Sequence, residues 1–549
     1  MLESINVKVN GKSTMVKRGI TLLELSKMYE EEYLHSIIIA KVDSEFHELN
    51  DTINKSCNIE FYDLTNSFAN RVYLNGLIFL ANYCFQELYG QKGYLLTRHS
   101  ADKGLYIEAT CKITCDMVRD LEIKMNEVVK DNLRIHKVTI LREDAINYFN
   151  EIGDTKKAGL LEYITNTYVN LYRMGNTYNY MFSLMPSETS SLSEFRLTYL
   201  SEEGFILRFP TLYSGLEIPR YKHHPKLFEL FKKSKDYLKL VNLETSVDLN
   251  NLITNGKIFD LIKINETLYS NQLLINAKEI AEDKKIKFVL IAGPSSSGKT
   301  TTTMKFSMYF KCFGLNPKVI SMDDFFVERE DTPKKANGEY DFECLEAVDL
   351  NLFNKTMENL IEGKKVKLPT FNFLTGKKEY KKEMTLEKND ILLIEGIHCL
   401  NPVILENINS SSIIKVYLSA LTEINIDKDN RISTTDNRLI RRLIRDYYKR
   451  GYNPEETLKL WENVRLGEEK NVFPYQDEAD ITINTGLVYE FPVLKVYALP
   501  LLYKIKKDSI YYEDAKRLLR LLDIFLPVPS EEIPNDSIIR EFIGGSYFE

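Results

Sequence analysis

The pattern of apolar and polar positions changes several times along the chain and indicates several structural units. Apolar and polar residues alternate over residues 5–9, and Asn10-Gly11 follows, which predicts a β-hairpin with a two-residue turn. Thr21-Leu22-Leu23-Glu24 has the form of a capping box and predicts a helix that begins there and ends near Glu31. This order is typical of a β-grasp domain. Further strands are expected at residues 37–42 and 59–62.

Helical and strand-like stretches alternate between residues 65 and 216, which predicts an α+β domain. Residues 217–284 are expected to form a helical connector, because the apolar spacing from residue 226 onward is helical. His223-His224-Pro225 precedes that spacing, and we expect the histidine pair to lie in a solvated turn because Pro225 stops the preceding element. The helices expected in the α+β domain cover residues 71–89, 115–129 and 142–151, and its strands include residues 106–110 and 205–209.

Near-continuous apolar runs separated by helical segments mark a last large domain at residues 285–500. Such runs are typical of parallel strands covered by helices on both faces of the sheet. The sequence therefore predicts a multidomain protein with a β-grasp domain at residues 1–64, the α+β domain, a C-terminal α/β domain with a parallel five-stranded sheet, and a helical tail at residues 501–549. The strands are expected at residues 288–292, 318–322, 391–395, 414–418 and 480–484.

A phosphate-binding loop joins the first of these strands to a helix. Residues 293–300, GPSSSGKT, fit the pattern G-x-x-x-x-G-K-[ST] at every fixed position. The glycines let backbone N–H groups surround an anion, Lys299 reaches terminal phosphates, and the hydroxyl of Thr300 is suited to bind Mg²⁺. The loop therefore predicts a site for a nucleoside triphosphate with Mg²⁺.

Carboxylates follow the second and third predicted strands. Because ligands gather at the carboxyl ends of parallel strands, Asp323, Asp324 and Glu395 are expected at the edge that carries the phosphate loop. One of the two aspartates could act as a base, and Glu395 could hold Mg²⁺ directly or through water, as a Walker B acid does. The alternative is that these acids are loop charges or helix N-caps.

An arginine-rich helix is predicted between residues 438 and 450. Its apolar residues can pack against the domain while guanidinium groups are presented to phosphates, as in a lid. A nucleic-acid patch and a merely solvated basic face are the alternatives. The basic face comprises Arg438, Arg442, Arg445 and Lys449, and the opposite side carries Leu439, Leu443 and Ile444.

Composition narrows the classes of function. The 549 residues carry a formal net charge of −7, which argues against a protein that coats nucleic acid, because that role needs a strong basic excess. No stretch approaches the roughly 18 apolar residues of a membrane span, and the start does not have the form of a leader, so we expect a cytoplasmic protein without membrane contact. The seven scattered cysteines are typical of reduced thiols.

Residues 285–500 resemble the uridine kinase and phosphoribulokinase family. The resemblance rests on the phosphate loop, on SMDDFF at residues 321–326, on YDFECLEAVD at residues 340–349 and on RLIRRLIRD at residues 438–446. It implies that Asp323 and Lys299 are catalytic, with Asp323 accepting the proton of a 5′-hydroxyl, and that Thr300 and Glu395 bind the metal. The implied ATP-binding residues are Gly293, Pro294, Ser295, Ser296, Ser297, Gly298, Lys299, Thr300, Thr301, Arg441, Arg442 and Arg445.

The substrate-binding residues implied by the resemblance are Glu343, Phe371, Phe373 and Arg438. Three positions depart from the family pattern. Glu343 replaces the usual aspartate, Phe371 replaces a tyrosine, and Gly376 falls where a base-reading histidine is expected. The sequence therefore leaves the identity of the nucleoside open.

The first 216 residues resemble the front of threonyl-tRNA synthetases, namely a TGS domain followed by an editing-associated domain. The editing centre of those enzymes holds zinc through an H-x-x-x-H helix, whereas the matching helix here, around Tyr73-Leu74-Asn75-Gly76-Leu77, has no histidine. None occurs between His47 and His99. We therefore expect the fold without the zinc chemistry.

These observations predict an ATP- and Mg²⁺-dependent kinase that phosphorylates a small-molecule hydroxyl, with the 5′-OH of uridine or a similar nucleoside as the first expectation. Another nucleoside or a phosphosugar is the alternative acceptor. A regulator that contacts tRNA through the synthetase-like front, and uses the phosphate loop as a nucleotide switch, is the alternative of a different class. The oligomeric state is left open.

Overall fold

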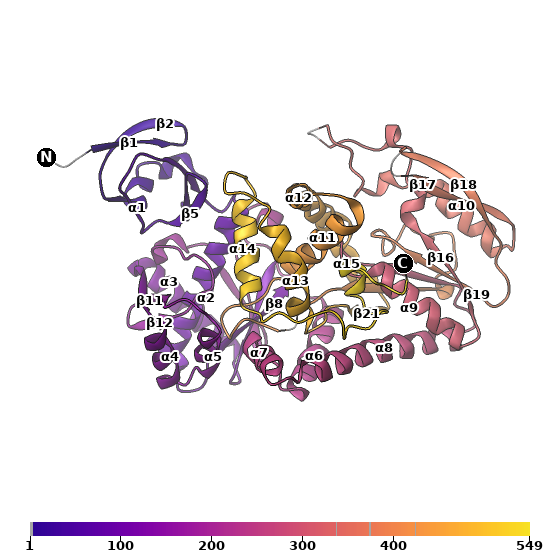
Figure 1. Ribbon diagram of the computed structural model, residues 1–549, viewed down its shortest axis with the longest axis horizontal. Helices are drawn as coiled ribbons and strands as arrows, with labels where there is room; N and C mark the ends of the chain where they lie inside the picture. Colours follow the sequence, from indigo (N-terminus) through magenta and orange to yellow (C-terminus); the bar gives the residue numbers. More distant parts are fainter. Residues whose placement is uncertain (1–3, 336–337, 373–374, 423, 549) are drawn as a thin grey trace.

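The computed structural model describes residues 4–335, 338–372, 375–422 and 424–548. The molecule is elongated, with the N-terminal sheet at one end and the parallel sheet at the other (Figure 1). Several separate sheets with helices between them form a multidomain protein of mixed α/β structure, as the sequence predicted.

The N-terminal unit is built around a tight hairpin. β1 (Ser4–Val9) pairs antiparallel with β2 (Lys12–Lys17), and Asn10 and Gly11 between them have φ values of 47° and 82°, as a type I′ turn requires. α1 (Leu22–Ser26) begins at the predicted capping box but ends before Glu31, and residues 30–32 form a separate 3-10 turn. The sheet order is β2-β1-β7-β4-β5, with β4 (Ile39–Val42), β5 (Glu45–Glu48) and β7 (Asn58–Tyr62); β3 (Ile20–Thr21) and β6 (Thr52–Ile53) pair beside it.

The second unit contains two sheets, in agreement with the predicted α+β pattern. α2 (Ser67–Tyr89) and α3 (Cys115–Asp131) share a hydrophobic core with the four-stranded sheet β13-β14-β9-β8. The three-stranded sheet β10-β11-β12 shares a smaller core with α4 and α5. The remaining elements are β8 (Leu95–Ala101), β9 (Gly104–Ala109), β10 (Ile135–Leu141), α4 (Arg142–Glu151), α5 (Thr155–Glu162), β11 (Tyr168–Met174), β12 (Thr177–Asn179), β13 (Arg196–Ser201) and β14 (Gly204–Arg208).

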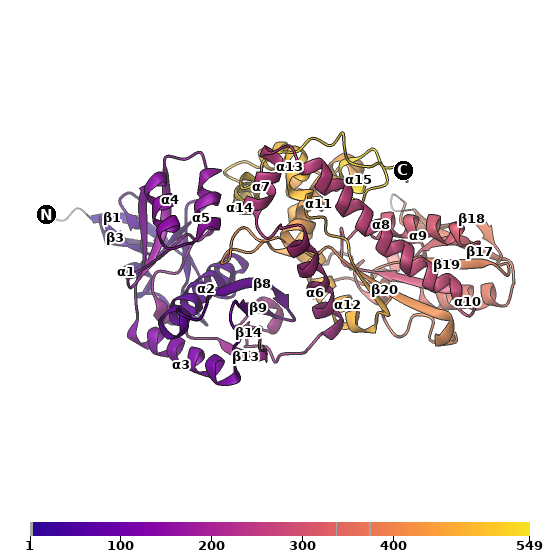
Figure 2. The ribbon, with the colours of Figure 1, turned by 90° about the horizontal axis from the view of Figure 1, so that it is seen from below.

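Three helices connect this unit to the parallel sheet: α6 (Pro225–Leu240), α7 (Ser246–Thr254) and α8 (Ile258–Glu282). α8 runs along the parallel-sheet end of the molecule (Figure 2). The prediction of a solvated turn before α6 is wrong for His224, which is only 5% exposed. Its Nδ1 lies 2.6 Å from Asp477, and its Nε2 lies 3.8 Å from Asp102, so carboxylates from two remote segments enclose the ring.

The five predicted strands form one parallel sheet in the order β16-β19-β15-β20-β21. One face packs on α8 and α9 (Lys299–Cys312), and the other packs on α10 (Leu350–Ile361). Each observed strand lies within two residues of its predicted limits. The strands are β15 (Phe288–Ala292), β16 (Asn316–Ser321), β19 (Asp390–Glu395), β20 (Ile413–Ser419) and β21 (Ile481–Asn484).

A hairpin and a helical layer complete the C-terminal half. β17 (Val366–Asn372) and β18 (Lys377–Met384) pair antiparallel beside the parallel sheet, and the sequence analysis did not predict them as a hairpin. The helices are α11 (Thr434–Arg450), α12 (Pro454–Asn471), α13 (Glu490–Leu502), α14 (Tyr512–Asp523) and α15 (Arg540–Ile543). α13 crosses the predicted boundary at residue 500, so the helical tail is continuous with the layer before it.

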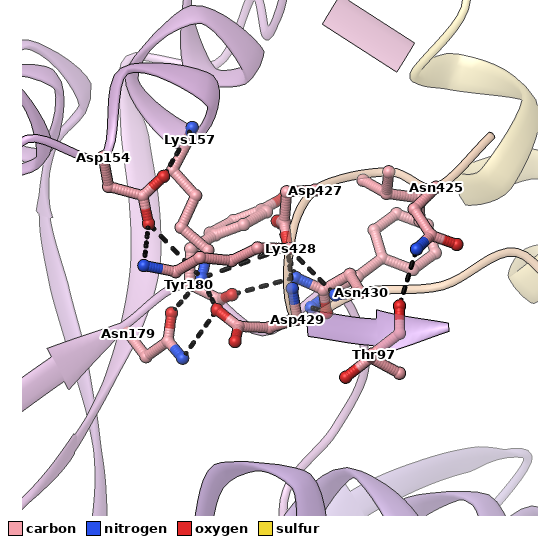
Figure 3. A network of polar contacts seen from close by, with 12 residues as sticks. Thr97, Asp154, Lys157, Asn179, Tyr180, Asn425, Asp427, Lys428, Asp429 and Asn430 are labelled. Atoms are coloured by element: carbon pink, nitrogen blue, oxygen red, sulfur yellow. Dashed lines mark hydrogen bonds and ion pairs between the residues drawn. The ribbon is translucent and has the colours of Figure 1, made fainter. Parts of the chain in front are cut away.

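A buried polar network joins the two halves of the molecule (Figure 3). Lys157 of α5 is fully buried and ion-paired with Asp429, and Asp427 lies 4.0 Å from the Lys157 ammonium. The loop that carries both aspartates also bonds to β8, because the Asn425 amide donates to the Thr97 carbonyl oxygen at 2.6 Å. We call Lys157, Asp427 and Asp429 the interdomain network.

Candidate active site

The phosphate loop connects β15 to α9 with the backbone geometry that its glycines allow. A Cβ atom at Gly293 would lie 2.4 Å from the Leu418 carbonyl oxygen, and Gly298 has a φ of 80°. Lys299 folds back onto the loop, and its Nζ donates to the carbonyl oxygens of Gly293 at 2.9 Å and Pro294 at 3.1 Å. The ammonium group is therefore held at the mouth of the loop.

Oxygen donors from two strand ends meet beside the loop. The Thr300 hydroxyl lies 3.4 Å from Oε1 of Glu395, which is the last residue of β19. Burial raises the pKa of Glu395 to about 7, and Asp323 and Glu541 add to the shift while Lys299 opposes it. A hydroxyl and a carboxylate are ligands that Mg²⁺ accepts together with water and phosphate oxygens, so these two residues fit the predicted metal role.

The two aspartates after β16 have different surroundings. Asp323 is exposed to solvent, yet the protein atoms around its carboxyl raise its pKa; Asp324 adds to this shift and Lys299 opposes it. Asp324 instead accepts a hydrogen bond from the Phe371 backbone N–H at 3.3 Å, which ties it to β17. Asp323 is thus the aspartate that is open to a ligand, and Asp324 supports the neighbouring hairpin.

Glu343 approaches the same edge of the sheet from the segment before α10. Burial raises the pKa of Glu343 to about 7, with Arg442 and Lys299 opposing the shift and Glu468 and Asp323 adding to it. Gly467 of α12 leaves the space for this side chain, because a Cβ there would lie 2.6 Å from the Glu343 Cβ. We call Asp323, Glu343 and Glu395 the strand-end cluster.

Two of the predicted lid arginines do not face open space. Arg438 and Arg441 are 1% and 0% exposed and lie against the carbonyl side of the phosphate loop. Arg438 donates to the Ser295 carbonyl oxygen at 3.1 Å, and Arg441 donates to the Ser296 carbonyl oxygen at 3.3 Å. The sequence predicted that Arg438 binds the substrate and that Arg441 binds ATP. In the structure each guanidinium instead contacts the loop backbone and is paired with a glutamate.

The acidic partners come from helices that the sequence analysis did not connect with the arginines. Glu468 of α12 accepts from Arg438 at 2.9 Å and also from the Ser295 N–H at 2.8 Å. Glu490 of α13 accepts from Arg441 at 2.6 Å. Neither glutamate belongs to a motif, so only their contacts in the folded chain reveal the role.

The remaining lid arginines lie closer to the open side of the loop. The Arg442 guanidinium donates to the Ser295 hydroxyl at 2.7 Å. Arg442 and Arg445 both pair with Asp446, which is fully buried. Of the predicted lid, these two side chains therefore remain candidates for contact with phosphates.

The predicted aromatic pocket is only partly observed. Phe371 is 4% exposed and packs in the core beneath the site, with its ring 5.7 Å from that of Phe326. Phe373 lies outside the described residues. The role of Phe371 as a direct substrate contact is therefore not supported by its position, because other side chains already surround its ring.

The C-terminal segment reaches the phosphate loop, which the sequence analysis did not foresee. Glu541 of α15 accepts hydrogen bonds from the N–H and the hydroxyl of Thr301 at 3.2 and 2.8 Å. Ile538 lies beside Gly298. The chain end thus contacts the first turn of α9, where a helix favours negative charge.

Comparison with known proteins agrees with this geometry. Residues 288–490 match the family described as "Phosphoribulokinase / Uridine kinase family". A uridine kinase of Borrelia turicatae is 30% identical over 211 residues, which cover 37% of this chain and 87% of that protein. The chain belongs to this family. The match to the family model begins at the first residue of β15 and ends at the first residue of α13.

The N-terminal half is similar to another class of protein. A threonine–tRNA ligase of Clostridium kluyveri is 24% identical over 260 residues, which are 47% of this chain but only 39% of that ligase.

Among solved structures, one described as a possible uridine kinase from Bacillus stearothermophilus is 21% identical and covers 36% of this chain and 89% of its own, with a TM-score of 0.23.

α2, which contains the segment compared above with the zinc-binding helix of editing domains, has an apolar face. Tyr73 and Leu77 of α2 are buried in the hydrophobic core. Within the described residues, no group of three histidine, cysteine or acidic side chains is arranged to hold a metal ion. None of the described helices is long and apolar enough to cross a membrane.

Proposed function

We propose that the protein is an ATP- and Mg²⁺-dependent kinase that phosphorylates the 5′-hydroxyl of uridine or a related nucleoside. The observation that carries the proposal is the position of Asp323, a carboxylate open to solvent near Lys299 of the phosphate loop. Phosphoryl transfer needs positioned charge and an oriented nucleophile more than covalent chemistry, and this arrangement supplies both.

Each residue has a role that follows from its surroundings. Lys299 and Arg442 would neutralise phosphate charge, and Thr300 with Glu395 would hold Mg²⁺, which would supply further positive charge to the transferred phosphate. Asp323 would orient the acceptor hydroxyl and take its proton. Arg438 and Arg441 would act indirectly, because they support the loop from its carbonyl side. We place the protein in the cytoplasm, where both substrates occur.

A panel of acceptors with purified protein, ATP and Mg²⁺ tests the proposal. Uridine, cytidine, adenosine, guanosine and a pentose phosphate should be compared by the release of ADP, with Lys299→Ala as the control. We expect turnover with a nucleoside that disappears in Lys299→Ala, because the lysine contacts the phosphates. Turnover with the pentose phosphate alone would show that the acceptor is a phosphosugar and not a nucleoside. An active, folded Lys299→Ala would overturn the phosphate-loop assignment.

Similarity to threonine–tRNA ligases favours one alternative, a regulator that binds tRNA through its N-terminal half. Phosphate contacts make such binding salt-dependent. Retention of tRNA at moderate salt, together with no turnover for any acceptor, would favour the regulator over the kinase.

A further inference from the structure

A cavity of about 180 Å³ lies between α2, the segment 426–433 and α14. No residue of the phosphate loop lines it. The walls are formed by apolar side chains from three parts of the chain that are far apart in sequence. These side chains include Phe68, Leu74, Ile78, Phe182 and Leu521.

Arginines from the same three elements line this cavity. Arg71 comes from α2, Arg431 from the loop before α11, and Arg517 and Arg520 from α14. Arg517 is ion-paired with Asp436 at 2.5 Å. The cavity thus collects four guanidinium groups around apolar walls, an arrangement that needs negative charge to offset it.

The carboxylates in and around the cavity do not balance these arginines. The lining residue Asp429 is already paired with Lys157, and Glu513 lies 3.4 Å from Lys516. Asp514 at the edge lies 3.4 Å from Arg517 and 4.0 Å from Arg71. Asp436 and Asp514 therefore oppose four arginines.

In the part of the chain that the structure describes, two of the arginines have no acidic partner: Arg431, which is partly buried, and Arg520, which is exposed. Within the described residues, Arg431 and Arg520 have no carboxylate within ion-pair distance. Burial lowers the pKa of Arg431 to about 10, with Asp436 as the opposing charge. The Nε of Arg517 is also buried without a hydrogen-bond partner. A buried donor without a partner, such as this Nε, is rare in folded proteins, and together with the unpaired charges of Arg431 and Arg520 it points to a bound anion.

We propose that this cavity binds the phosphate group of a small phosphorylated compound, through Arg71, Arg431 and Arg520, with the body of the compound against the apolar walls. Guanidinium groups recognise phosphate by paired N–H donors, and several of them together favour a dianion. The aromatic rings of Phe68 and Phe182 suit a planar body, so a nucleoside monophosphate is the test case.

The small volume of about 180 Å³ favours a small molecule over a nucleic acid. Residues of the interdomain network form part of the wall through Asp429, so the site exists only when both halves of the chain are together. A ligand bound in the cavity would therefore stabilise the contact between the two halves. The site would exist whether or not the phosphate loop is catalytic.

Isothermal titration of the full chain with inorganic phosphate and with uridine monophosphate tests the proposal. Because the phosphate loop also binds these anions, each titration is repeated in Lys299→Ala. We expect a site that persists in Lys299→Ala and that Arg431→Gln weakens at least about tenfold, since one charge-assisted hydrogen bond is lost. Arg520→Gln, at an exposed position, should weaken it without affecting folding.

Arg119→Gln is the matched control, because Arg119 is an exposed arginine of α3 that pairs with Asp116 and does not line the cavity. It should leave the titration unchanged. Equal binding in wild type, Arg431→Gln and Arg520→Gln would overturn the proposal, as would the absence of any site beyond the one that Lys299→Ala removes. Retention of tRNA by the wild type but not by Arg431→Gln would identify RNA as the ligand and overturn the small-molecule assignment.

Discussion

The strand-end cluster and the interdomain network both place carboxylates near a lysine, but their charges are balanced differently. In the network, Asp427 and Asp429 raise the pKa of Lys157 although burial lowers it. Lys157 lowers the pKa of Asp429 in spite of burial, whereas burial raises the pKa of Asp427. In the cluster, burial raises the pKa of Glu343 and Glu395 to about 7, because Lys299 does not compensate for it.

This difference separates a structural contact from a ligand site. In the network both aspartates have partners within the folded chain, because they share the Lys157 ammonium and accept hydrogen bonds from the amides of Asn430 and Asn179. The cluster remains short of positive charge, and a metal ion bound to a nucleotide would supply it. The raised pKa of Glu343 and Glu395, next to the phosphate loop, thus indicates where a bound cation would be stabilised.

Lys157→Met breaks the balance in the network and should give the largest effect. Removing the ammonium leaves two buried aspartates without their partner, which typically costs about 3–5 kcal/mol of folding free energy. The midpoint of chemical unfolding reports the loss. Lys156→Met is the control, because Lys156 is more exposed and its pair with Asp248 should contribute less than about 1 kcal/mol. Equal midpoints for both variants would contradict the assigned role of Lys157.

The sequence predicted the strand-end cluster more completely than the network, for a physical reason. The phosphate loop, Asp323 and Glu395 each follow a strand whose apolar run is visible in the sequence, and a parallel sheet brings such strand ends together. Lys157 and Asp429 meet only because two distant units dock, and no periodicity encodes that contact.

The arginines of α11 show the same limit. Their helical spacing was predicted, but Glu468 and Glu490, which bury Arg438 and Arg441, lie on separate helices. An acidic residue in a long helix is indistinguishable in sequence from a solvated one. Burial of His224 was missed for the same reason, since Asp102 and Asp477 are remote in the chain.

Asp323→Asn should lower turnover by roughly 10²-fold or more, in the range of a positioned base, while ATP affinity changes only a few fold. Asp324→Asn is the matched control. Asp324 accepts the Phe371 N–H, and an amide oxygen can still accept that bond, so its effect should be mild. Both variants are measured at saturating ATP and acceptor. If Asp324→Asn loses most of its turnover while Asp323→Asn is nearly normal, Asp324 would be the base in place of Asp323.

Glu395 of the cluster and Asp429 of the network should contribute to stability with opposite pH dependences before any ligand is added. Glu395 has a folded-state pKa raised to about 7, so its carboxyl binds more protons in the folded state and its contribution to stability falls as pH rises from the unfolded pKa toward 7. The lowered pKa of Asp429 acts in the other direction, because its contribution is lost as pH falls.

Glu395→Gln should therefore raise the thermal midpoint at pH 8 relative to wild type, which corresponds to a gain in folding free energy on the order of 1 kcal/mol. At pH 5 the midpoint should be nearly unchanged. Added Mg²⁺ and ATP should stabilise the wild type at pH 8 more than this variant. A variant that is less stable at pH 8 without ligand would mean that the Glu395 charge is already satisfied, as in the network.

Glu541→Gln tests a smaller contribution to the same imbalance. The Glu541 carboxylate contacts Thr301 at the first turn of α9 and adds to the raised pKa of Glu395. The negative charge of Glu541 stabilises the N-terminus of α9 when no nucleotide is bound, by about 0.3–1 kcal/mol. The same charge repels a phosphate bound there by a similar free energy. We expect Glu541→Gln to tighten ATP binding by about two- to fivefold and to lower the thermal midpoint slightly without ATP.

Glu531→Gln, an exposed change in the same segment, should change neither ATP binding nor the thermal midpoint. Weaker ATP binding in Glu541→Gln would show that the carboxylate holds the loop in its binding geometry, and the chain end would then belong to the site as a support rather than as a competitor of the nucleotide.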